Sequence, residues 1–308
     1  MERPRIVIAG GSGFIGTALA GLLASQNHEV VVLSRSPKNR GNQVREIGWD
    51  GVSVGPWAGE LAGAAAVINL AGRSIDCPHT PKNIGEFISS RVNSVKAIGM
   101  AVKQLRVPPR VWVQASAAGY YGDTGDHACD EQAPSGTDAL AEVCRQWEAA
   151  ISAGDIPSVR LVKLRIGFVL GHGGGAFPVV ARLARWFLGG TAGNGRQYMS
   201  WIHLRDLLRI FLEAVRCGSW SGIYNATAPC PVTNAEFMRT LRQVLHRPWS
   251  PPAAAAAVRL GARLMGSEGS LALISQRCPP IRLTGAGFEF EFPDLRPALE
   301  DLVKGPPG

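Results

Sequence analysis

The sequence predicts an α/β fold in which a doubly wound parallel sheet carries a smaller, mainly helical carboxy-terminal lobe. Strand and helix patterns alternate over the first two-thirds of the chain, a glycine-rich turn joins the first strand to the first helix, and the alternation loosens after Gly171. Such alternation is typical of parallel sheets with helices on both faces. The chain has 308 residues, 46% of them hydrophobic, which is enough for one such domain and a smaller lobe.

The expected strands are short apolar runs bounded by turn residues, at 5–9, 29–33, 44–49, 65–70, 111–115 and 159–165. Helical spacing of apolar residues predicts helices between them over 15–23, 82–106 and 138–152. Later helices are predicted near 177–188, 204–216, 233–246, 253–265 and 294–303, separated by prolines and glycine-rich turns. We therefore divide the chain into a sheet domain over 1–170 and a lobe over 171–308 that is partly interleaved with it.

The turn after the first strand has the spacing of a dinucleotide-binding loop, Gly10-Gly11-Ser12-Gly13-Phe14-Ile15-Gly16. Glycines at this spacing let the backbone turn tightly, approach a pyrophosphate and pack the helix against the strand. The free N–H groups of the helix N-terminus then favour an anion. Because a strand precedes the turn and a helix follows it, a glycine loop without function is the weaker interpretation. The sequence predicts a Rossmann-type unit whose cofactor contacts are Gly10, Ser12, Gly13, Phe14, Ile15 and Gly16.

The end of the second strand indicates which dinucleotide binds. An NAD site typically has Asp or Glu here, whereas this chain has Arg35. A carboxylate would bond the ribose 2′-OH, but an arginine can hold a 2′-phosphate. Ser34 adds a hydroxyl, and Lys38 and Arg40 add cations, for which a solvated loop is an equally good interpretation. The sign of the charge at Arg35 predicts NADP(H).

Composition and charge exclude several classes of protein. The apolar runs are too short for a membrane span and the first residues do not fit a signal peptide, so we expect a cytoplasmic location. The six cysteines are scattered, without metal-ligand spacing, and we expect reduced thiols and no metal. The net charge of +8 is spread along the chain, which favours a phosphate-bearing ligand over nucleic acid. We expect a small-molecule partner, no nucleic acid and no membrane, and leave a homodimer open.

Further motifs follow in an order that is known from one enzyme superfamily. They are Val67-Ile68-Asn69-Leu70-Ala71-Gly72, Gln114-Ala115-Ser116 before Gly119-Tyr120-Tyr121-Gly122, Trp201-Ile202-His203 with Asp206, and Gly287-Phe288 leading to Phe292-Pro293. With them the chain resembles the extended and atypical short-chain dehydrogenase/reductases, which include nucleotide-sugar epimerases. It resembles most closely the epimerase family proteins of family 39U, nearly end to end, including their carboxy-terminal segment over about 248–303. The resemblance implies a Rossmann-type sheet that binds NADP(H) and a lobe that covers the site.

The resemblance also implies cofactor contacts outside the glycine turn. Leu70-Ala71-Gly72 would run beneath the adenosine half, Glu86 and Arg91 would lie at its edge, and Phe168 would approach the nicotinamide. Leu70 as strand core, and Glu86 with Arg91 as a solvated helix pair, are the simpler alternatives. The chain departs from its relatives at Cys77-Pro78-His79-Thr80-Pro81-Lys82, which replaces a tryptophan-containing segment. The contacts of that loop are therefore open.

The proton relay of that superfamily is missing from this chain. Its members use a tyrosine whose pKa is lowered by a lysine one helical turn along. None of the four tyrosines here has such a lysine. Alignment on Glu148 places Ala141 and Arg145 at the tyrosine and lysine positions. Trp147 and Glu148 are then expected to serve as helix packing and as a surface or capping contact.

Two hydroxyls remain as catalytic candidates. Ser116 follows a strand at the sheet edge where ligands bind in open α/β folds, and it matches the superfamily's substrate-orienting hydroxyl. Tyr121, next to Tyr120, is a nearby phenol that could replace the proton donor, with aromatic lining of the pocket as the alternative. His203 has no second ligand at metal spacing, so we interpret it as structural.

Two functional hypotheses follow from these residues. The first is an NADP(H)-binding oxidoreductase or epimerase-like protein that acts on a small polar substrate, nucleotide-linked substrates included, with Ser116 and Tyr121 orienting it. The second is a non-catalytic NADPH sensor or scaffold that has lost the tyrosine and lysine relay.

Overall fold

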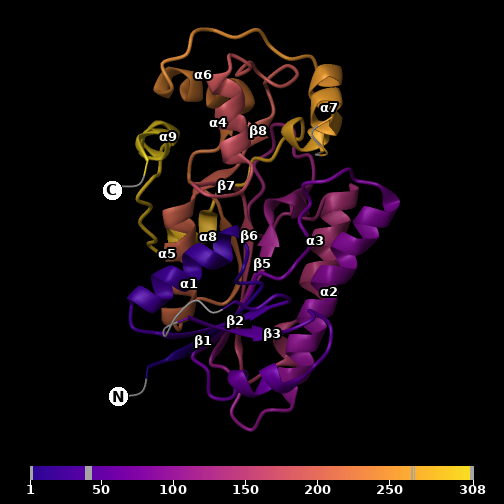
Figure 1. Cartoon of the computed structure of the whole chain (residues 1–308), viewed down its shortest axis with the longest axis vertical. Helices are drawn as coiled ribbons and strands as arrows, with labels where there is room; N and C mark the ends of the chain where they lie inside the picture. Colours follow the sequence, from indigo (N-terminus) through magenta and orange to yellow (C-terminus); the bar gives the residue numbers. More distant parts are fainter. Residues whose placement is uncertain (1–2, 39–43, 265, 267, 306–308) are drawn as a thin grey trace.

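The computed structural model describes residues 3–38, 44–264, 266 and 268–305 (Figure 1). Its largest unit is a seven-stranded sheet of order β10-β6-β5-β4-β1-β2-β3, in which every neighbouring pair is parallel. The strands are β1 (Arg5–Ala9), β2 (Glu29–Ser34), β3 (Val44–Gly48), β4 (Ala66–Asn69), β5 (Val111–Ala117), β6 (Arg160–Ile166) and β10 (Gly222–Ala226). The strand order reverses between β1 and β4, as in doubly wound folds. The predicted fold class is confirmed.

Six of these strands lie where the sequence predicts them, and β10 was not predicted. It is five residues long and includes Gly222 and Asn225, so it lacks the apolar run of a buried strand. The Asn225 side-chain amide nevertheless is buried and donates to the carbonyls of Cys129 (3.2 Å) and Pro279 (3.0 Å). These partners are distant in sequence, and no local pattern indicates them.

Helices cover both faces of the sheet (Figure 1). Alternate side chains of β1 and β2 point to opposite faces, so Ile6 and Ile8 join one apolar cluster while Val7 and Ala9 join another. The first cluster is completed by α1 (Phe14–Ser25) and α5 (Leu204–Arg216), and the second by α2 (Pro81–Lys103) and α3 (Ala139–Ala149). Helix α5 and β10 thus return to the sheet from the second half of the chain.

The lobe has its own apolar cluster, to which α4 (Phe177–Arg185), α6 (Asn234–Val244) and α9 (Leu295–Lys304) contribute. Short pairs add to it, β7 (Phe168–Leu170) with β9 (Trp201–His203) and β8 (Tyr198–Met199) with β11 (Val232–Thr233). The remaining helices are α7 (Ala255–Leu264) and α8 (Ile281–Gly285), with short 3-10 turns at η1 (Pro56–Leu61), η2 (Ala118–Tyr121), η3 (Ala153–Asp155) and η4 (Gly269–Ala272). Figure 1 places the lobe at one end of the long axis of the molecule.

The helix predicted over 177–188 ends earlier, at Arg185. Phe187 has a φ of 63°, a left-handed conformation that cannot continue an α-helix. The N–H of Leu188 bonds back to the carbonyl of Leu183 (2.9 Å), which closes the last turn. Side-chain periodicity does not reveal such an ending, so the helix range predicted from the sequence is too long.

The start of α5 ties the end of the chain to the sheet domain. His203 caps the helix. Its ring centroid lies 4.0 Å from that of Phe292, and its Nε2 lies 3.3 Å from Asp301 Oδ2. Asp206 is fully buried and accepts bonds from the backbone N–H groups of Glu291 (2.8 Å) and Phe292 (2.9 Å). The Trp-Ile-His motif and its aspartate therefore hold the carboxy-terminal segment in place.

The burial of His203 predicts a loss of stability at mildly acidic pH. Desolvation lowers its pKa to about 4, and attraction to Asp301 offsets only part of that effect. The unfolded chain, with an ordinary histidine pKa of about 6.5, takes up the proton first, so the free energy of unfolding falls by about 2–3 kcal/mol as pH drops from 6.5 to 4. The variant His203→Asn keeps a capping side chain but does not titrate. Urea unfolding across this interval should show a shallower pH dependence for the variant, and parallel curves would contradict the assignment.

Candidate functional site

Two loops meet where the strand order of the sheet reverses. Gly10 has a φ of +76°, and a Cβ built on it would lie 2.8 Å from the Cα and N of Ala71. Only glycine allows this approach. Asn69 fixes the second loop, because its Oδ1 accepts from the Ala71 N–H (3.0 Å) while its Nδ2 donates to Gln114 Oε1 (3.0 Å). The predicted contacts Leu70-Ala71-Gly72 and the glycine turn are thus brought together.

The first turn of α1 faces outward at this junction. Gly13 is its N-cap, with no side-chain cap and no acidic residue in the first turn. A Cβ on Gly16 would lie 2.5 Å from the Cα of Gly11, so this glycine lets the helix pack on the turn. Ser12 and Gly13 are exposed, while Ile15 packs against the core. The arrangement leaves the helix N–H groups accessible to an anion.

A second glycine-rich loop lies over this turn. Cβ atoms on Gly171, Gly174 and Gly175 would come within 2.8, 2.7 and 3.2 Å of the Phe14 ring. Phe14 is therefore held between the sheet domain and the loop that follows β7. The glycines of this loop, which follow the end of the regular strand and helix alternation, are therefore needed for close packing against Phe14.

Arg35 lies exposed at the end of β2. The N–H of Gly10 donates to the Leu33 carbonyl (3.1 Å), which sets this strand end beside the glycine turn. Ser34 is buried, and its Oγ accepts from the Ser36 N–H (3.3 Å). Within the described residues, the Arg35 guanidinium makes no hydrogen bond or ion pair. Arg40 lies outside the described part of the chain, and Lys38 is exposed.

Arg91 lies at the other edge of the junction. Its side chain would be 3.1 Å from a Cβ on Gly72, its Cζ is 4.9 Å from the Trp147 ring centroid, and its Nη1 donates to the Phe87 carbonyl (3.2 Å). Burial lowers its pKa, and no described carboxylate pairs with it. Glu86 instead pairs with Arg73. The alternative of a solvated Glu86–Arg91 pair is therefore wrong.

Ser116 belongs to a buried polar network. Its Oγ donates to Glu148 Oε1 at 2.6 Å, and the carboxylate of Glu148 receives both Nε and Nη2 of Arg165 at 2.9 Å. All three residues are buried. The expectation that Glu148 is a surface or capping contact is wrong, because Arg165 on the neighbouring strand β6 satisfies its charge. Sequence reasoning missed Arg165, although a cation inside an apolar strand was a signal for it.

Tyr121 extends the same network. Its hydroxyl donates to Asn225 Oδ1 (2.7 Å) and accepts from Arg165 Nη1 (2.9 Å). Burial raises the pKa of the phenol above its ordinary value, and the positive charge of Arg165 offsets only part of that rise. Tyr121 is therefore neutral at physiological pH and has a protein acceptor for its proton. Tyr120 also contacts this guanidinium, with its ring centroid 3.5 Å from the Arg165 Cζ, and its ring meets that of Tyr121 edge-on.

The positions aligned with the usual relay differ in exposure. Ala141 is fully buried in α3, whereas Arg145 is exposed and pairs with Glu142 on the same helix. Lys163 is held by the carbonyls of Glu148 (2.6 Å) and Ile151 at the end of α3. Among the described residues, neither Arg145 nor Lys163 is hydrogen-bonded to Tyr121.

Phe168 lies in the apolar cluster of the lobe. Its N–H donates to the Ser200 carbonyl (2.7 Å), and its ring meets that of Phe237 edge-on, with centroids 6.0 Å apart. Its approach to the nicotinamide stays a prediction.

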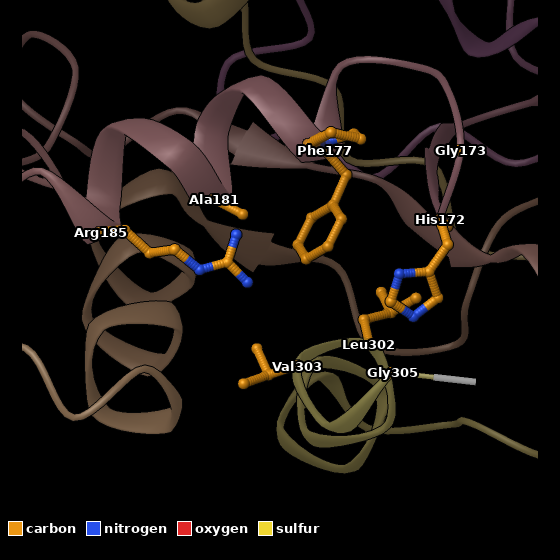
Figure 2. A pocket seen from close by; sticks show the side chains of 10 residues that line it. His172, Gly173, Phe177, Ala181, Arg185, Leu302, Val303 and Gly305 are labelled. Atoms are coloured by element: carbon orange, nitrogen blue, oxygen red, sulfur yellow. The ribbon is translucent and has the colours of Figure 1, made fainter. Parts of the chain in front are cut away.

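A cavity of about 300 Å³ lies beside the glycine loop over Phe14, between α4 and the end of α9. Figure 2 shows His172 and Arg185 at its rim, with Phe177 and Val303 among the apolar lining. The sequence-predicted site residues are not among its lining residues. It shares Gly171 with the loop that packs on Phe14.

The Glu148–Arg165 pair predicts a large effect of a small substitution. Glu148→Gln keeps the shape but leaves the Arg165 charge buried without a counter-charge, which costs about 3–5 kcal/mol of unfolding free energy. Glu142→Gln on the same helix removes only an exposed pair and should cost less than about 1 kcal/mol. Chemical denaturation of the two variants measures the two losses of unfolding free energy. Equal losses would show that the buried pair stabilises the fold no more than the exposed pair does.

Comparison with known proteins supports these observations. Residues 6–226 match the family described as "NAD dependent epimerase/dehydratase family", and residues 253–302 match a domain of unknown function, DUF1731. The chain is 35% identical over 306 residues to "Epimerase family protein SDR39U1 homolog, chloroplastic" of Arabidopsis thaliana, with 97% of this chain and 86% of that protein covered.

Solved structures agree with this match. The crystal structure of human epimerase family protein SDR39U1 with NADPH has a TM-score of 0.86 at 32% identity and covers 98% of this chain and 99% of its own. MoeE5 in complex with UDP-glucuronic acid and NAD shares the fold, with a TM-score of 0.76 at 21% identity over 97% of this chain and 98% of its own. The resemblance to family 39U is confirmed, and the chain belongs to the NAD dependent epimerase/dehydratase family.

Proposed function

We propose that this protein binds NADP(H) at the junction of the two loops, with the 2′-phosphate on Arg35. The observation that carries the proposal is the exposed Arg35 guanidinium beside the Gly10 turn, without a partner among the described residues. A cation at this strand end suits a phosphate and gives a ribose hydroxyl no acceptor. The NADPH in the structure of the human relative supports the same cofactor.

The rest of the junction provides for the other parts of the cofactor. The uncapped first turn of α1 would receive the pyrophosphate. Arg91, half-buried and without a described carboxylate partner, supplies a cation at the edge of the site, beside Gly72. Leu70 and Ala71 would form the wall beneath the adenosine.

The proposal predicts that Arg35→Ala changes cofactor preference. Loss of a charge-assisted contact to the 2′-phosphate should weaken NADPH binding by about 10- to 100-fold and leave NADH binding unchanged. Arg106→Ala is the matched control, because Arg106 is an exposed arginine beyond the end of α2. Calorimetric titration of both cofactors measures the balance. Absence of NADPH binding, or an unaltered preference in Arg35→Ala, would refute the assignment.

We further propose an oxidoreductase or epimerase reaction on a small polar substrate, nucleotide-linked substrates included, in the cytoplasm. Ser116 at the carboxyl end of β5 and Tyr121 in the following turn would orient the substrate. When bound, the nicotinamide would supply or accept hydride. Ser116 would then exchange its 2.6 Å bond to Glu148 for one to the substrate. Arg165 would hold Tyr121 in place.

A second function is favoured by the same network. The hydroxyl protons of Ser116 and Tyr121 already have buried acceptors, Glu148 and Asn225. A protein that binds NADPH tightly without turnover, as a sensor or scaffold, needs no free proton donor.

Substrate conversion separates the two functions, and it must be followed by product analysis as well as by cofactor oxidation, because an epimerase returns its cofactor to the starting redox state. With sugar-nucleotide, ketone and aldehyde substrates, the enzyme hypothesis predicts turnover that Tyr121→Phe lowers by about 100-fold or more, with NADPH binding retained. Tyr198→Phe is the control, since this tyrosine contacts Arg277 in the lobe. Tight NADPH binding with no turnover across the panel is the result that the sensor hypothesis predicts.

A further inference from the structure

Four large apolar side chains are exposed at the end of the lobe. Trp186 is 73%, Phe187 55%, Leu188 67% and Trp249 74% exposed. The first three follow α4 directly, and Trp249 lies in the connection from α6 to α7. We call these four residues the apolar tip. Figure 1 shows that connection crossing the end of the molecule farthest from β1–β3.

The two segments of the apolar tip lie side by side. The Arg247 Cζ is 5.3 Å from the Phe187 ring centroid, and Arg242 Nη1 donates to the Gly189 carbonyl at 2.5 Å. Gly190 is so close to the second segment that a Cβ on it would lie 1.8 Å from the Pro251 carbonyl oxygen. The segment that follows α4 and the segment that follows α6 therefore fix each other in place beneath the apolar tip.

The two stretches of chain that carry the apolar tip are cationic. The sequence has no Asp or Glu between Asp155 and Asp206, and none between Glu236 and Glu268. These two stretches contain α4, the apolar tip and most of α6. They carry exposed arginines, namely Arg182 on α4, Arg239 on α6 and Arg247 beside the Phe187 ring.

We propose that the apolar tip docks on the surface of an anionic lipid bilayer. Tryptophan, phenylalanine and leucine beside arginine are the side chains with which proteins enter the interface of a membrane without spanning it. The arginines would meet lipid phosphates and anionic headgroups while the tryptophans enter the headgroup region. No helix in the described ranges is long and apolar enough to cross a membrane, which agrees with a peripheral contact.

Charge argues against a second copy of the chain as the occupant. A twofold contact through the apolar tip would place the arginines of both copies against each other. Neither segment contains a carboxylate that could pair with them. The expectation from the sequence that no membrane partner exists rested on the absence of membrane spans. It could not take the four exposed side chains into account, because their exposure follows from the fold.

Vesicle sedimentation of the full chain tests the proposal. The protein is mixed with vesicles of phosphatidylcholine alone or of phosphatidylcholine with phosphatidylserine. Binding is expected only with phosphatidylserine, and it should weaken as salt rises. The double variant Trp186→Ser with Trp249→Ser, and separately Arg182→Gln with Arg239→Gln, should each weaken binding at least about tenfold.

Val107→Ser is the control, because Val107 is 61% exposed and lies in the sheet domain, where its carbonyl accepts from the Gly63 N–H. Thermal unfolding and NADPH binding of each variant establish that the fold is retained. Absence of phosphatidylserine-dependent sedimentation, or binding that the tip variants leave intact, overturns the proposal. Self-association that the tryptophan variants abolish, without vesicle binding, would assign the apolar tip to a second copy instead.

Discussion

The ion pair between Glu148 and Arg165 joins the parts of the molecule on which the candidate chemistry depends. It connects α3 to β6, and through Ser116 and Tyr121 it also fixes the end of β5 and the turn after it. Burying two charges is costly unless the geometry is good and the remaining polar atoms are satisfied. Here the pair is bidentate, and Asn225 on β10 completes the network. The late strand β10 is thus needed for the site as much as for the sheet.

The arginines explain how a net charge of +8 is distributed. Arg160 and Arg282 hold backbone carbonyls at the ends of helices and strands, so their charge serves the fold. Arg165 has a carboxylate. Arg35 and Arg91, at the junction of the two loops, have no carboxylate partner among the residues that the structure describes. These two cations therefore lie beside the glycine turn, where a phosphate-bearing ligand is expected.

Local pattern was sufficient for the first half of this structure. The strands, the glycine turn and Arg35 follow one another closely in sequence, and the steric demands of Gly10 and Gly16 are those of a single βαβ unit. The burial of Glu148 on α3 could not be predicted in this way, because its partner Arg165 lies on the strand β6. Likewise β10 is stabilised by carbonyls distant in sequence. What the sequence missed are contacts between elements, whose register only the fold determines.

Cofactor binding and chemistry are physically separate in this site. The residues proposed to hold NADP(H) present open groups, namely an exposed guanidinium, an uncapped helix turn and the glycine turn beside Leu70 and Ala71. The residues proposed for chemistry are closed on one another, since Ser116 and Tyr121 both donate to buried acceptors. A substrate that needs the Ser116 proton must therefore compete with Glu148 for it, and that carboxylate is a strong acceptor held in place by Arg165. Tight binding of the cofactor does not by itself imply turnover, because the two depend on different residues and different hydrogen bonds.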